Sequence, residues 1–417
     1  MASTIKGRYW VAAGMFLLAL LLYIDRVCIS VAKDPIAREL GLSDKAMGWV
    51  LSAFALGYAL MQVPSGMMAD RYGPRKVLAG IVTFWSGLTA LTGAAWNFMS
   101  LLGIRFLFGA GEAGAFPGMS RAIYSWIPLK ERGIITGINF SGSRLGAAFA
   151  LPLVAYMITS FGWRTTFIIL GGVGVIWAIG WWSLFRDTPE EHPMLKEQEK
   201  DYILKTRQQV SGETAILNRK ELLQSRNMWS AIGQYFCSNF TFFFALTWLF
   251  PYLKNKYQLE TMEAGWYAVM PFIAGAVGNW VAGGMVDSIF TKGNWNRSRS
   301  LPAIIGFGLA AMGLIGSLYM STPLGAILFL SIAIFGADMT LPPSWALCVD
   351  IGKSNSGAVS GTMNMAGNLG SFLTALAFPY LTDWTGSVDY FFYVAAALNV
   401  IAILLWWKVK AEKGLAY

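Results

Sequence analysis

The chain has 417 residues, of which 55% are hydrophobic and only 13% are charged, and its mean hydropathy is +0.50. Soluble globular domains carry about 25% charged residues, so this composition excludes an ordinary soluble protein and indicates a polytopic membrane protein. The net charge of +9 could indicate a nucleic-acid partner, but the basic residues follow alternate loops, a pattern that excludes nucleic acid and is typical of membrane topology.

Twelve apolar segments are each long enough to cross a bilayer as a helix, which takes about 20 residues. They predict an all-α membrane protein with twelve transmembrane helices, rich in glycine and proline as membrane helices commonly are. In chain order the predicted spans cover residues 9–31, 45–69, 77–97, 99–120, 133–159, 163–185, 229–253, 262–288, 301–321, 324–350, 355–383 and 388–408.

A polar stretch over residues 186–228 separates the first six spans from the last six. Within it, residues 194–208 and 214–226 have amphipathic helical patterns, which predict helices along the cytoplasmic surface. The predicted organisation is an N-terminal six-helix bundle over residues 1–185, this central loop, and a C-terminal six-helix bundle over residues 229–417.

The lysines and arginines predict the orientation in the membrane. Of the 32, 23 lie at the termini and in one set of alternate loops, six lie in the opposite set, and three lie inside spans. The positive-inside rule therefore predicts that both termini are cytoplasmic in a multi-pass cell-membrane protein. No cleavable signal peptide is expected, because the first span carries Asp25 and Arg26.

The three cysteines, Cys28, Cys237 and Cys348, are scattered through apolar segments. Their spacing fits neither a metal site nor a disulfide framework, and small apolar packing is the expected role. No metal and no cofactor is predicted.

Six charged residues lie inside predicted spans and away from their ends, where a charge is costly and needs a reason. They are Asp25, Arg26, Arg105, Glu112, Arg144 and Asp338. Arg105 and Glu112 are two helical turns apart and so face the same side, about 10 Å apart along the axis. A buried cation beside a titratable acid can hold an organic anion and couple its movement to protons.

The sharpest motif closes the second span, where residues 66–76 read Gly-Met-Met-Ala-Asp-Arg-Tyr-Gly-Pro-Arg-Lys. Gly66 permits a close helix approach, while Asp70 can cap a helix N-terminus and pair with arginines of the tight Gly-Pro turn. We expect a cytoplasmic clasp that holds one conformation and opens in the other, formed by Gly66, Asp70, Arg71, Gly73 and Arg75. The alternative is simply a basic inside loop.

A faint repeat relates the two halves. Gly66 to Asp70 ends the second span and Gly283 to Asp287 ends the eighth, with the same interval and with basic residues following both. Two six-helix halves with a site between them are typical of one transporter architecture.

The motif at residues 66–76 resembles the loop signature of the major facilitator superfamily, and the similarity covers essentially the whole chain. Three further stretches, residues 23–26, 105–117 and 188–193, resemble the anion–cation symporter family. That family includes bacterial transporters of hexuronates, aldonates such as galactonate and aldarates such as glucarate, and animal vesicular carriers of glutamate and sialic acid. The chain departs from the drug-antiporter pattern, because residues 142–146 lack a Gly-Pro-Gly-Gly run.

The resemblance implies that Asp25 and Glu112 carry protons and that Arg26 receives the substrate carboxylate. The residues agree with it, since no histidine lies in a predicted span and arginine offers a charged fork for a carboxylate. The alternative is that these charges pair permanently between helices, and for Arg105 a structural role is nearly as well supported. Tyr58 resembles the tyrosine that contacts substrate in related symporters.

Arg144 leaves two interpretations open. It could meet a second substrate carboxylate, which would suit a sugar diacid. It could equally neutralise Glu112 or Asp25.

The last six spans carry hydrogen-bonding side chains in place of cations. Gln234, Ser238 and Thr241 share one helix face, and Asn364 and Asn368 share another. The tenth span holds Asp338, Thr340, Ser344 and Trp345 around Pro342-Pro343, where we expect a break that opens backbone groups to a cavity. Amides and hydroxyls suit a sugar acid, so the candidate substrate contacts here are Gln234, Ser344, Trp345, Asn364 and Asn368.

The sequence therefore predicts uptake of an organic anion, most simply a sugar acid, by proton-coupled symport and alternating access in the bacterial inner membrane. The expected partners are the anion, protons and the lipid bilayer, and the expected state is a monomer that is not an enzyme. The alternatives are a transporter of another carboxylate such as an aromatic acid, a facilitator without coupling, and a transporter-like sensor of sugar acids.

Overall fold

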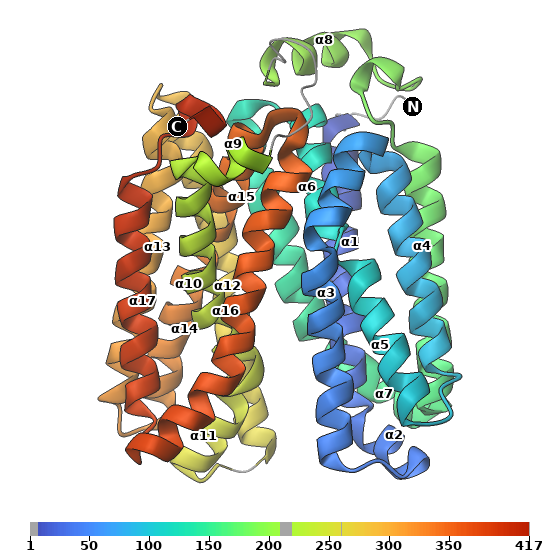
Figure 1. Ribbon diagram of the computed structural model, residues 1–417, viewed down its shortest axis with the longest axis vertical. Helices are drawn as coiled ribbons and strands as arrows, with labels where there is room; N and C mark the ends of the chain where they lie inside the picture. Colours follow the sequence, from blue (N-terminus) through green and yellow to red (C-terminus); the bar gives the residue numbers. More distant parts are fainter. Residues whose placement is uncertain (1–6, 209–218, 260, 417) are drawn as a thin grey trace. The chain divides into compact units, whose positions relative to one another are not determined.

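Helices account for the regular structure of the chain (Figure 1). The computed structural model describes residues 7–208, 219–259 and 261–416, and within these ranges there is no strand. Each predicted span is mostly helical, so the prediction of an all-α membrane fold is confirmed. Seven of the helical stretches described are long and apolar enough to cross a membrane.

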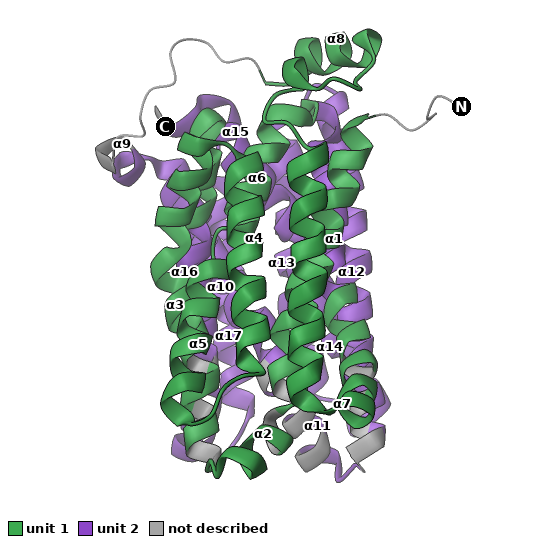
Figure 2. Cartoon of the chain, turned by 90° about the vertical axis from the view of Figure 1, so that its right-hand side faces the viewer, with its two compact units in different colours: residues 1–129, 145–216, 352–361 green, residues 130–144, 217–351, 362–417 purple. Residues whose placement is uncertain are grey.

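The described helices fall into two compact units (Figure 2), which we treat separately. Unit 1 comprises Met1–Leu129, Leu145–Ile216 and Gly352–Gly361, and unit 2 comprises Lys130–Arg144, Leu217–Ile351 and Thr362–Tyr417. A division of the chain at the central loop would differ from this one, because residues 130–144 belong to unit 2 and residues 352–361 belong to unit 1. The predicted bundles over residues 1–185 and 229–417 remain a prediction.

Unit 1 begins with the helices of the first spans. They are α1 (Gly7–Val31), α2 (Lys33–Leu40), α3 (Asp44–Tyr72), α4 (Pro74–Thr92), α5 (Phe98–Glu112), α6 (Ala115–Trp126), α7 (Arg132–Leu184) from Leu145 onward, and α8 (Glu197–Thr206). Gly162 interrupts α7 with φ 79° and ψ 160°, which separates the fifth predicted span from the sixth. The fourth predicted span is divided after Glu112 into α5 and α6.

Unit 2 holds the beginning of α7 and the helices of the later spans. They are α9 (Arg219–Gln224), α10 (Arg226–Thr247), α11 (Leu249–Tyr257), α12 (Thr261–Thr291), α13 (Trp295–Leu318), α14 (Pro323–Met339), α15 (Leu341–Gly352), α16 (Ser356–Thr385) from Thr362 onward, and α17 (Asp389–Trp407). The tenth predicted span is divided at Thr340, two residues before Pro342, as the sequence predicts.

Side-chain caps fix where several helices begin. Ser43, Ser225 and Thr322 accept hydrogen bonds from backbone N–H groups in the first turns of α3, α10 and α14. Asn97 and Ser100 form a reciprocal capping box at the start of α5. These polar residues satisfy N–H groups that a helix cannot satisfy itself.

Close contact between α3 and α5 organises unit 1. A Cβ added to Gly57 would lie 2.1 Å from the Phe106 carbonyl oxygen, and one added to Gly109 would lie 2.1 Å from the Phe54 carbonyl oxygen. Only glycine leaves room for backbones this close. The contact brings the α3 residues Phe54 and Tyr58 against the charged residues of α5.

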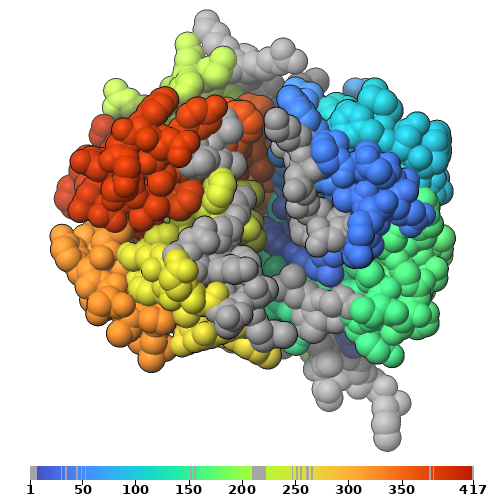
Figure 3. Space-filling view, turned by 90° about the horizontal axis from the view of Figure 1, so that it is seen from below, coloured from blue at the N-terminus to red at the C-terminus, as the bar shows by residue number. Residues whose placement is uncertain are grey.

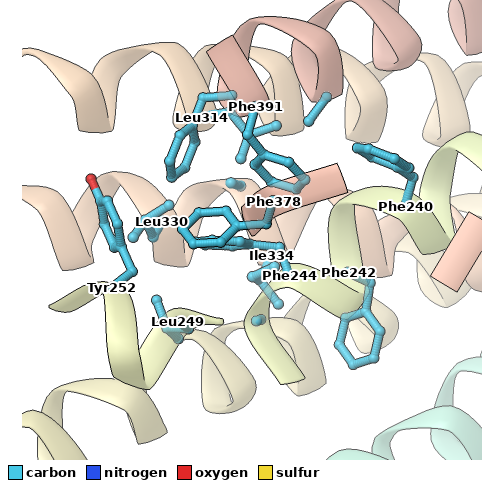
Figure 4. Close-up of a cluster of buried hydrophobic side chains, with 14 of the residues drawn as sticks. Phe240, Phe242, Phe244, Leu249, Tyr252, Leu314, Leu330, Ile334, Phe378 and Phe391 are labelled. Atoms are coloured by element: carbon cyan, nitrogen blue, oxygen red, sulfur yellow. The ribbon is translucent and has the colours of Figure 1, made fainter. Parts of the chain in front are cut away.

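Aromatic packing organises unit 2. Rings from α10, α11, α16 and α17 converge around Phe244, whose centroid lies 5.1–5.8 Å from those of Tyr252, Phe378, Phe391 and Phe392 (Figure 4). Phe242 belongs to the same cluster but points away from the other labelled rings. In an end-on view, the orange, yellow and red atoms of this unit adjoin one another (Figure 3).

The segment after α7 is hydrogen-bonded to the start of α1. Glu199 of α8 accepts hydrogen bonds from the backbone N–H groups of Gly7 and Arg8, at 2.7 and 3.2 Å. His192 lies edge-on to Trp126, and its Nε2 is 3.0 Å from the Leu184 carbonyl oxygen. Burial lowers the pKa of His192. Helices are confirmed at α8 and α9, while residues 209–218 of the predicted surface helices lie outside the described residues.

Candidate functional site

An arginine and a glutamate meet in the interior of unit 1. Arg26 of α1 donates from Nε to Glu112 Oε2 at 2.7 Å, and the two side chains are 17% and 0% exposed. Glu112 is the last residue of α5, so the pair joins two helices that are far apart in the sequence. The second oxygen, Glu112 Oε1, has no hydrogen-bond partner among the described residues.

Three aromatic rings surround the Arg26 guanidinium. Its Cζ lies 4.6 Å from the ring centroid of Tyr58, 5.1 Å from that of Tyr23 and 5.2 Å from that of Phe54. Rings at these distances attract a cation and hold a planar guanidinium in one orientation. Tyr58 is 3% exposed, so the structure brings this predicted contact into the same site as Arg26.

Asp25 and Arg105 complete this group of charges. Asp25 is 1% exposed, and neither of its carboxylate oxygens has a hydrogen-bond partner among the described residues. Arg105 is 3% exposed and lies against Phe108, 4.6 Å from the ring centroid. We call Asp25, Arg26, Arg105 and Glu112 the acid–arginine cluster. Both acids and both arginines expected in this region are therefore brought together.

The acid–arginine cluster holds two acids and two arginines, so it is neutral when both acids are ionised. Protonation of either acid leaves a net positive charge at a buried site, which favours an anion. Buried polar atoms without partners are uncommon in folded proteins, and this cluster contains them on Asp25, Arg26, Arg105 and Glu112. The arrangement can therefore exchange protons and accept an anionic ligand.

Arg144 is paired in unit 2. Its Nε and Nη2 donate to Asp338 Oδ2 and Oδ1 at 2.7 and 2.6 Å, and the two side chains are 4% and 1% exposed. Asp338 is a carboxylate partner that the sequence did not indicate for Arg144, and the interpretations that Arg144 meets a substrate carboxylate or neutralises Glu112 or Asp25 stay predictions. The first segment of α7 belongs to unit 2, so the residue's place in the first half of the sequence was misleading.

Three predicted substrate contacts of unit 2, Gln234, Ser344 and Trp345, take part in hydrogen bonds between helices. Gln234 Oε1 accepts from Ser344 Oγ at 3.1 Å and from Trp406 Nε1 at 3.3 Å. Trp345 Nε1 donates to the Tyr235 hydroxyl at 2.9 Å. Gln234 and Ser344 are fully buried, and these bonds fasten α10, α15 and α17 together.

The other polar residues of unit 2 occupy separate positions. Asn368 Nδ2 donates to the Asn364 carbonyl oxygen along α16, and Ser238 and Thr340 hydroxyls are 2.9 Å apart. Thr241 accepts from Asn399 of α17. The predicted face of Gln234, Ser238 and Thr241 therefore bonds α15, α17 and Thr340, the residue between α14 and α15.

Asp70 of the loop motif caps a helix within unit 1. Its Oδ1 and Oδ2 accept from the N–H groups of Gly357 and Ala358 at 2.9 and 2.8 Å, at the start of α16. A Cβ added to Gly66 would lie 2.2 Å from the Gly357 carbonyl oxygen, so this close approach needs glycine. The cap that the sequence predicts is present.

The expected pairing of Asp70 with the arginines of the Gly-Pro turn is wrong. Among the ion pairs of the described residues, Asp70 faces Arg121 of α6 at 3.9 Å. Arg75 donates its N–H to Asp187 Oδ1 at 2.7 Å and its guanidinium to the Trp182 carbonyl oxygen. The reason is that Arg75 lies in the first turn of α4, where its side chain reaches Trp182 and not Asp70. Arg71 is exposed and lies over the ring of Tyr72.

The repeated motif makes the same cap in unit 2. Asp287 accepts from the N–H groups of Gly133 and Ile134 at 2.8 and 2.7 Å, at the start of α7. A Cβ added to Gly283 would lie 2.7 Å from the Gly133 carbonyl oxygen. The faint repeat in the sequence thus corresponds to one structural device used twice.

Sequence reasoning missed a buried ion group in unit 2. Asp350 accepts from Arg132, from Arg299 Nε at 2.7 Å and from Trp295 Nε1 at 2.9 Å. Both arginines and Asp350 have fully buried side chains. The available signal was an aspartate at the end of an apolar run, while both arginines were taken for loop residues.

Bundled apolar helices with arginine–carboxylate pairs in their interiors define a multi-pass helical membrane protein. The family model of the Major Facilitator Superfamily matches residues 15–375, and the chain belongs to this superfamily. The superfamily resemblance inferred from the loop motif is therefore confirmed.

Relatives and solved structures agree with this assignment. The chain is 34% identical over 405 residues to a probable sulfoacetate transporter of Cupriavidus necator, covering 97% of this chain and 94% of the relative. It is 30% identical over 419 residues to a probable galactarate/D-glucarate transporter of Escherichia coli, covering 96% and 92%. The structure of the proton:xylose symporter XylE matches with a TM-score of 0.77 at 15% identity, covering 98% and 97%, which shows the common fold.

Proposed function

We propose that this protein takes up an organic anion, a sugar acid in the first instance, by symport with protons and alternating access. The observation that carries the proposal is the acid–arginine cluster of unit 1, in which buried acids with unpartnered oxygens adjoin two arginines. The galactarate/D-glucarate relative supports the substrate class.

In this proposal Arg26 receives a carboxylate of the substrate, and Tyr58 holds the guanidinium in place. Its pairing with Glu112 must loosen when the anion binds, and protonation of Glu112 makes that exchange favourable. Asp25 supplies the second proton-carrying group, because it is buried and its carboxylate oxygens have no hydrogen-bond partner in the part of the chain that the structure describes. Arg105 keeps the site positive when the acids are protonated.

The caps at Asp70 and Asp287 supply the conformational device. Each carboxylate holds the start of one helix by two backbone hydrogen bonds, and such bonds at a helix N-terminus break and form as a unit. We propose that both open during the cycle. In the bacterial inner membrane, with both termini cytoplasmic, this chain would work as a monomer.

The second candidate is uptake of a small sulfonate-bearing acid. The probable sulfoacetate transporter of Cupriavidus necator favours it, at 34% identity over nearly the whole of both chains. Such a ligand has an anionic group for an arginine but needs few of the amides and hydroxyls of unit 2.

Uptake by purified protein in liposomes tests the proposal. An imposed inward proton gradient should drive accumulation of one of the labelled acids, D-galactonate, D-glucarate or sulfoacetate, and a proton ionophore should abolish it. Accumulation that the ionophore leaves unchanged would overturn proton coupling. Saturable binding of an acid without any uptake or counterflow would favour a sensor.

A further inference from the structure

One aromatic ring in unit 1 is shared by two arginines. The Cζ atom of Arg26 lies over the Phe54 ring, 5.2 Å from its centroid, and the Cζ atom of Arg105 lies over the same ring at 5.3 Å. The transport scheme above gives Phe54 no task beyond enclosing Arg26. Two like charges repel each other, so a ring that both of them contact calls for an explanation.

The close contact between α3 and α5 fixes the position of this ring. Phe54 and Tyr58 are about one turn apart on α3, and Arg105 and Phe108 are about one turn apart on α5, so each pair shares a helix face. A Cβ added to Gly109 would lie 2.1 Å from the Phe54 carbonyl oxygen. The backbone of Phe54 is therefore held against α5, and its side chain is the part that can adjust.

Three rings form a continuous row beside the arginines, with Phe54 in the middle. The Phe54 centroid lies 5.5 Å from that of Tyr58 and 5.7 Å from that of Phe108. Arg26 lies over Tyr58 and Arg105 over Phe108, each at 4.6 Å, in addition to the ring that they share. Cation–π attraction is strongest where water is excluded, and Arg105 is only 3% exposed. The row therefore restrains both guanidiniums at once.

The two arginines act on the two acids of the cluster. Arg26 donates a hydrogen bond to Glu112 at 2.7 Å, while the charge of Arg105 acts on both Glu112 and Asp25. The other groups that act on Asp25 are Glu112 itself and the indole of Trp85 on α4. A displacement of Arg105 therefore changes the electrostatic environment of Asp25.

We propose that Phe54 is a positioning residue that couples the two arginines, so that an anion bound at Arg26 acts through the shared ring on Arg105 and from there on Asp25. This inference rests on the proposed function and deepens it, because it names a route from the substrate to a proton-carrying acid.

The direction of the coupling follows from the contacts. When a substrate carboxylate draws Arg26 from the ring, Phe54 is left to Arg105, which the ring then holds more firmly and which acts less on Asp25. With less positive charge acting on it, the Asp25 carboxylate accepts a proton more readily. The anion and the proton thereby favour each other's binding, as symport requires, and the effect is reciprocal.

The pH dependence of anion binding tests the inference, because coupling between two sites changes the affinity of one with the occupancy of the other. Calorimetry gives the affinity of the purified full-length protein for D-galactonate, D-glucarate and sulfoacetate at a mildly acidic and a mildly alkaline pH. Phe54→Leu keeps the bulk without the ring, Phe54→Tyr keeps the ring, and Phe54→Met is a second ringless variant in case the leucine variant does not fold. The matched control is Phe167→Leu, a buried ring of the same unit that packs edge-on against Trp163.

The wild type should bind at least one of these acids about tenfold more tightly at the acidic pH, as a coupling of ordinary size would give. The ringless variants should reduce this ratio to about twofold or less, whereas Phe54→Tyr and Phe167→Leu should keep it. In liposomes, the ringless variants should keep counterflow exchange and lose about tenfold of the accumulation that a proton gradient drives. Phe54→Tyr should accumulate the acid as the wild type does.

A ring that only orients Arg26 for binding would behave differently. Affinity would then fall by the same factor at both pH values, and counterflow would fall together with accumulation. That outcome, a wild-type pH ratio in the ringless variants, or an equal loss in Phe54→Tyr would overturn the inference while leaving proton symport intact. Failure of both ringless variants to fold would mark Phe54 as a structural residue and would overturn it as well.

The wild type separates this inference from the proposed function. Accumulation driven by a proton gradient, without any pH dependence of binding, would overturn the coupling route alone. A wild type that shows neither pH-dependent binding nor proton-driven accumulation of the three acids would overturn the proposed symport, and this inference with it.

Discussion

The two units differ in how a buried arginine is hydrogen-bonded to its carboxylate partner. In unit 1, Arg26 gives Glu112 a single hydrogen bond, remains 17% exposed, and adjoins an acid with two unpartnered oxygens. In unit 2, Arg144 gives Asp338 two hydrogen bonds, and both side chains are almost completely buried. The first pair leaves hydrogen-bonding capacity unused, while the second satisfies both oxygens of its acid.

This difference suggests different roles for similar residues. An under-satisfied pair responds to a proton or to a ligand at small cost, because few bonds must break. A satisfied pair remains closed until a competitor of the same chemistry arrives. The comparison agrees with the proposed proton exchange at Glu112, and the following changes would break or sharpen it.

The largest effect is expected for Glu112→Gln, which mimics the protonated acid. The variant should lose accumulation driven by a pH gradient, yet keep counterflow exchange, because binding no longer depends on a proton at this position. Uptake and counterflow in liposomes measure both. If the variant still concentrated substrate under a pH difference alone, Asp25 would have to carry the coupling.

Asp350→Asn measures how much a purely structural ion group contributes to the free energy of unfolding. The change leaves two fully buried arginines without their carboxylate, so we expect a loss of about 3–5 kcal/mol of unfolding free energy. Thermal unfolding of the purified protein checks it, with Asp338→Asn as the comparison. An equal loss in both variants would place Asp338 among the structural acids.

Arg26→Lys should impair binding although it keeps the charge. Lysine cannot offer two parallel hydrogen bonds, and losing one charged bond of about 1.5–3 kcal/mol weakens affinity about tenfold to a hundredfold. Calorimetric titration with the transported acid gives the value. The matched control is Arg164→Lys, an exposed arginine paired with Glu39, and wild-type affinity in the Arg26 variant would remove that residue from the site.

Asp70→Asn and Asp287→Asn test whether the two caps are equivalent. Each loses the charge at a helix N-terminus, which is worth about 0.3–1 kcal/mol, so exchange rates should change only severalfold and affinity should stay near wild type. Exchange in liposomes and calorimetry separate rate from affinity. A large affinity loss at normal exchange rates would contradict a conformational role.

The smallest effect is expected for Glu39→Gln, in α2 of unit 1. Hydrogen bonds from Trp163 and then from Arg164 lower the pKa of Glu39, so its carboxylate stabilises the fold at neutral pH. This stabilisation is lost as the pH falls through that lowered pKa, and the stability of the variant should lack this part of its pH dependence. Melting curves at several pH values measure a small difference, because the pair is exposed.

Much of the fold could be predicted because the local composition of a segment determines whether it can form a membrane helix. A span needs about 20 apolar residues, so hydropathy alone placed the helical segments, and Pro342 marked the break after Thr340. The charges of the acid–arginine cluster were also predictable, since a charge in an apolar run is conspicuous. Asp350 escaped notice because it stands where such a run ends.

Pairing could not be predicted in the same way. Arg144 was assigned possible partners in its own half of the sequence, yet Asp338 lies 194 residues away. Gln234 and Ser344 share a polar character with substrate contacts, but their bonds to each other and to Trp406 depend on which helices are neighbours. Arg75 follows α4 toward Trp182, a direction no local pattern contains.

The sequence by itself determined the helices, the membrane character and the charges that lie in the middle of apolar runs, because these follow from the cost of placing each residue type in an apolar medium. Only the tertiary structure decided which charge meets which. Opposite charges pair in the interior where helix packing brings them into contact, and packing joins residues that the sequence separates. That is why Arg26 and Arg144 have the same chemistry in the sequence but different partners, exposure and proposed roles in the fold.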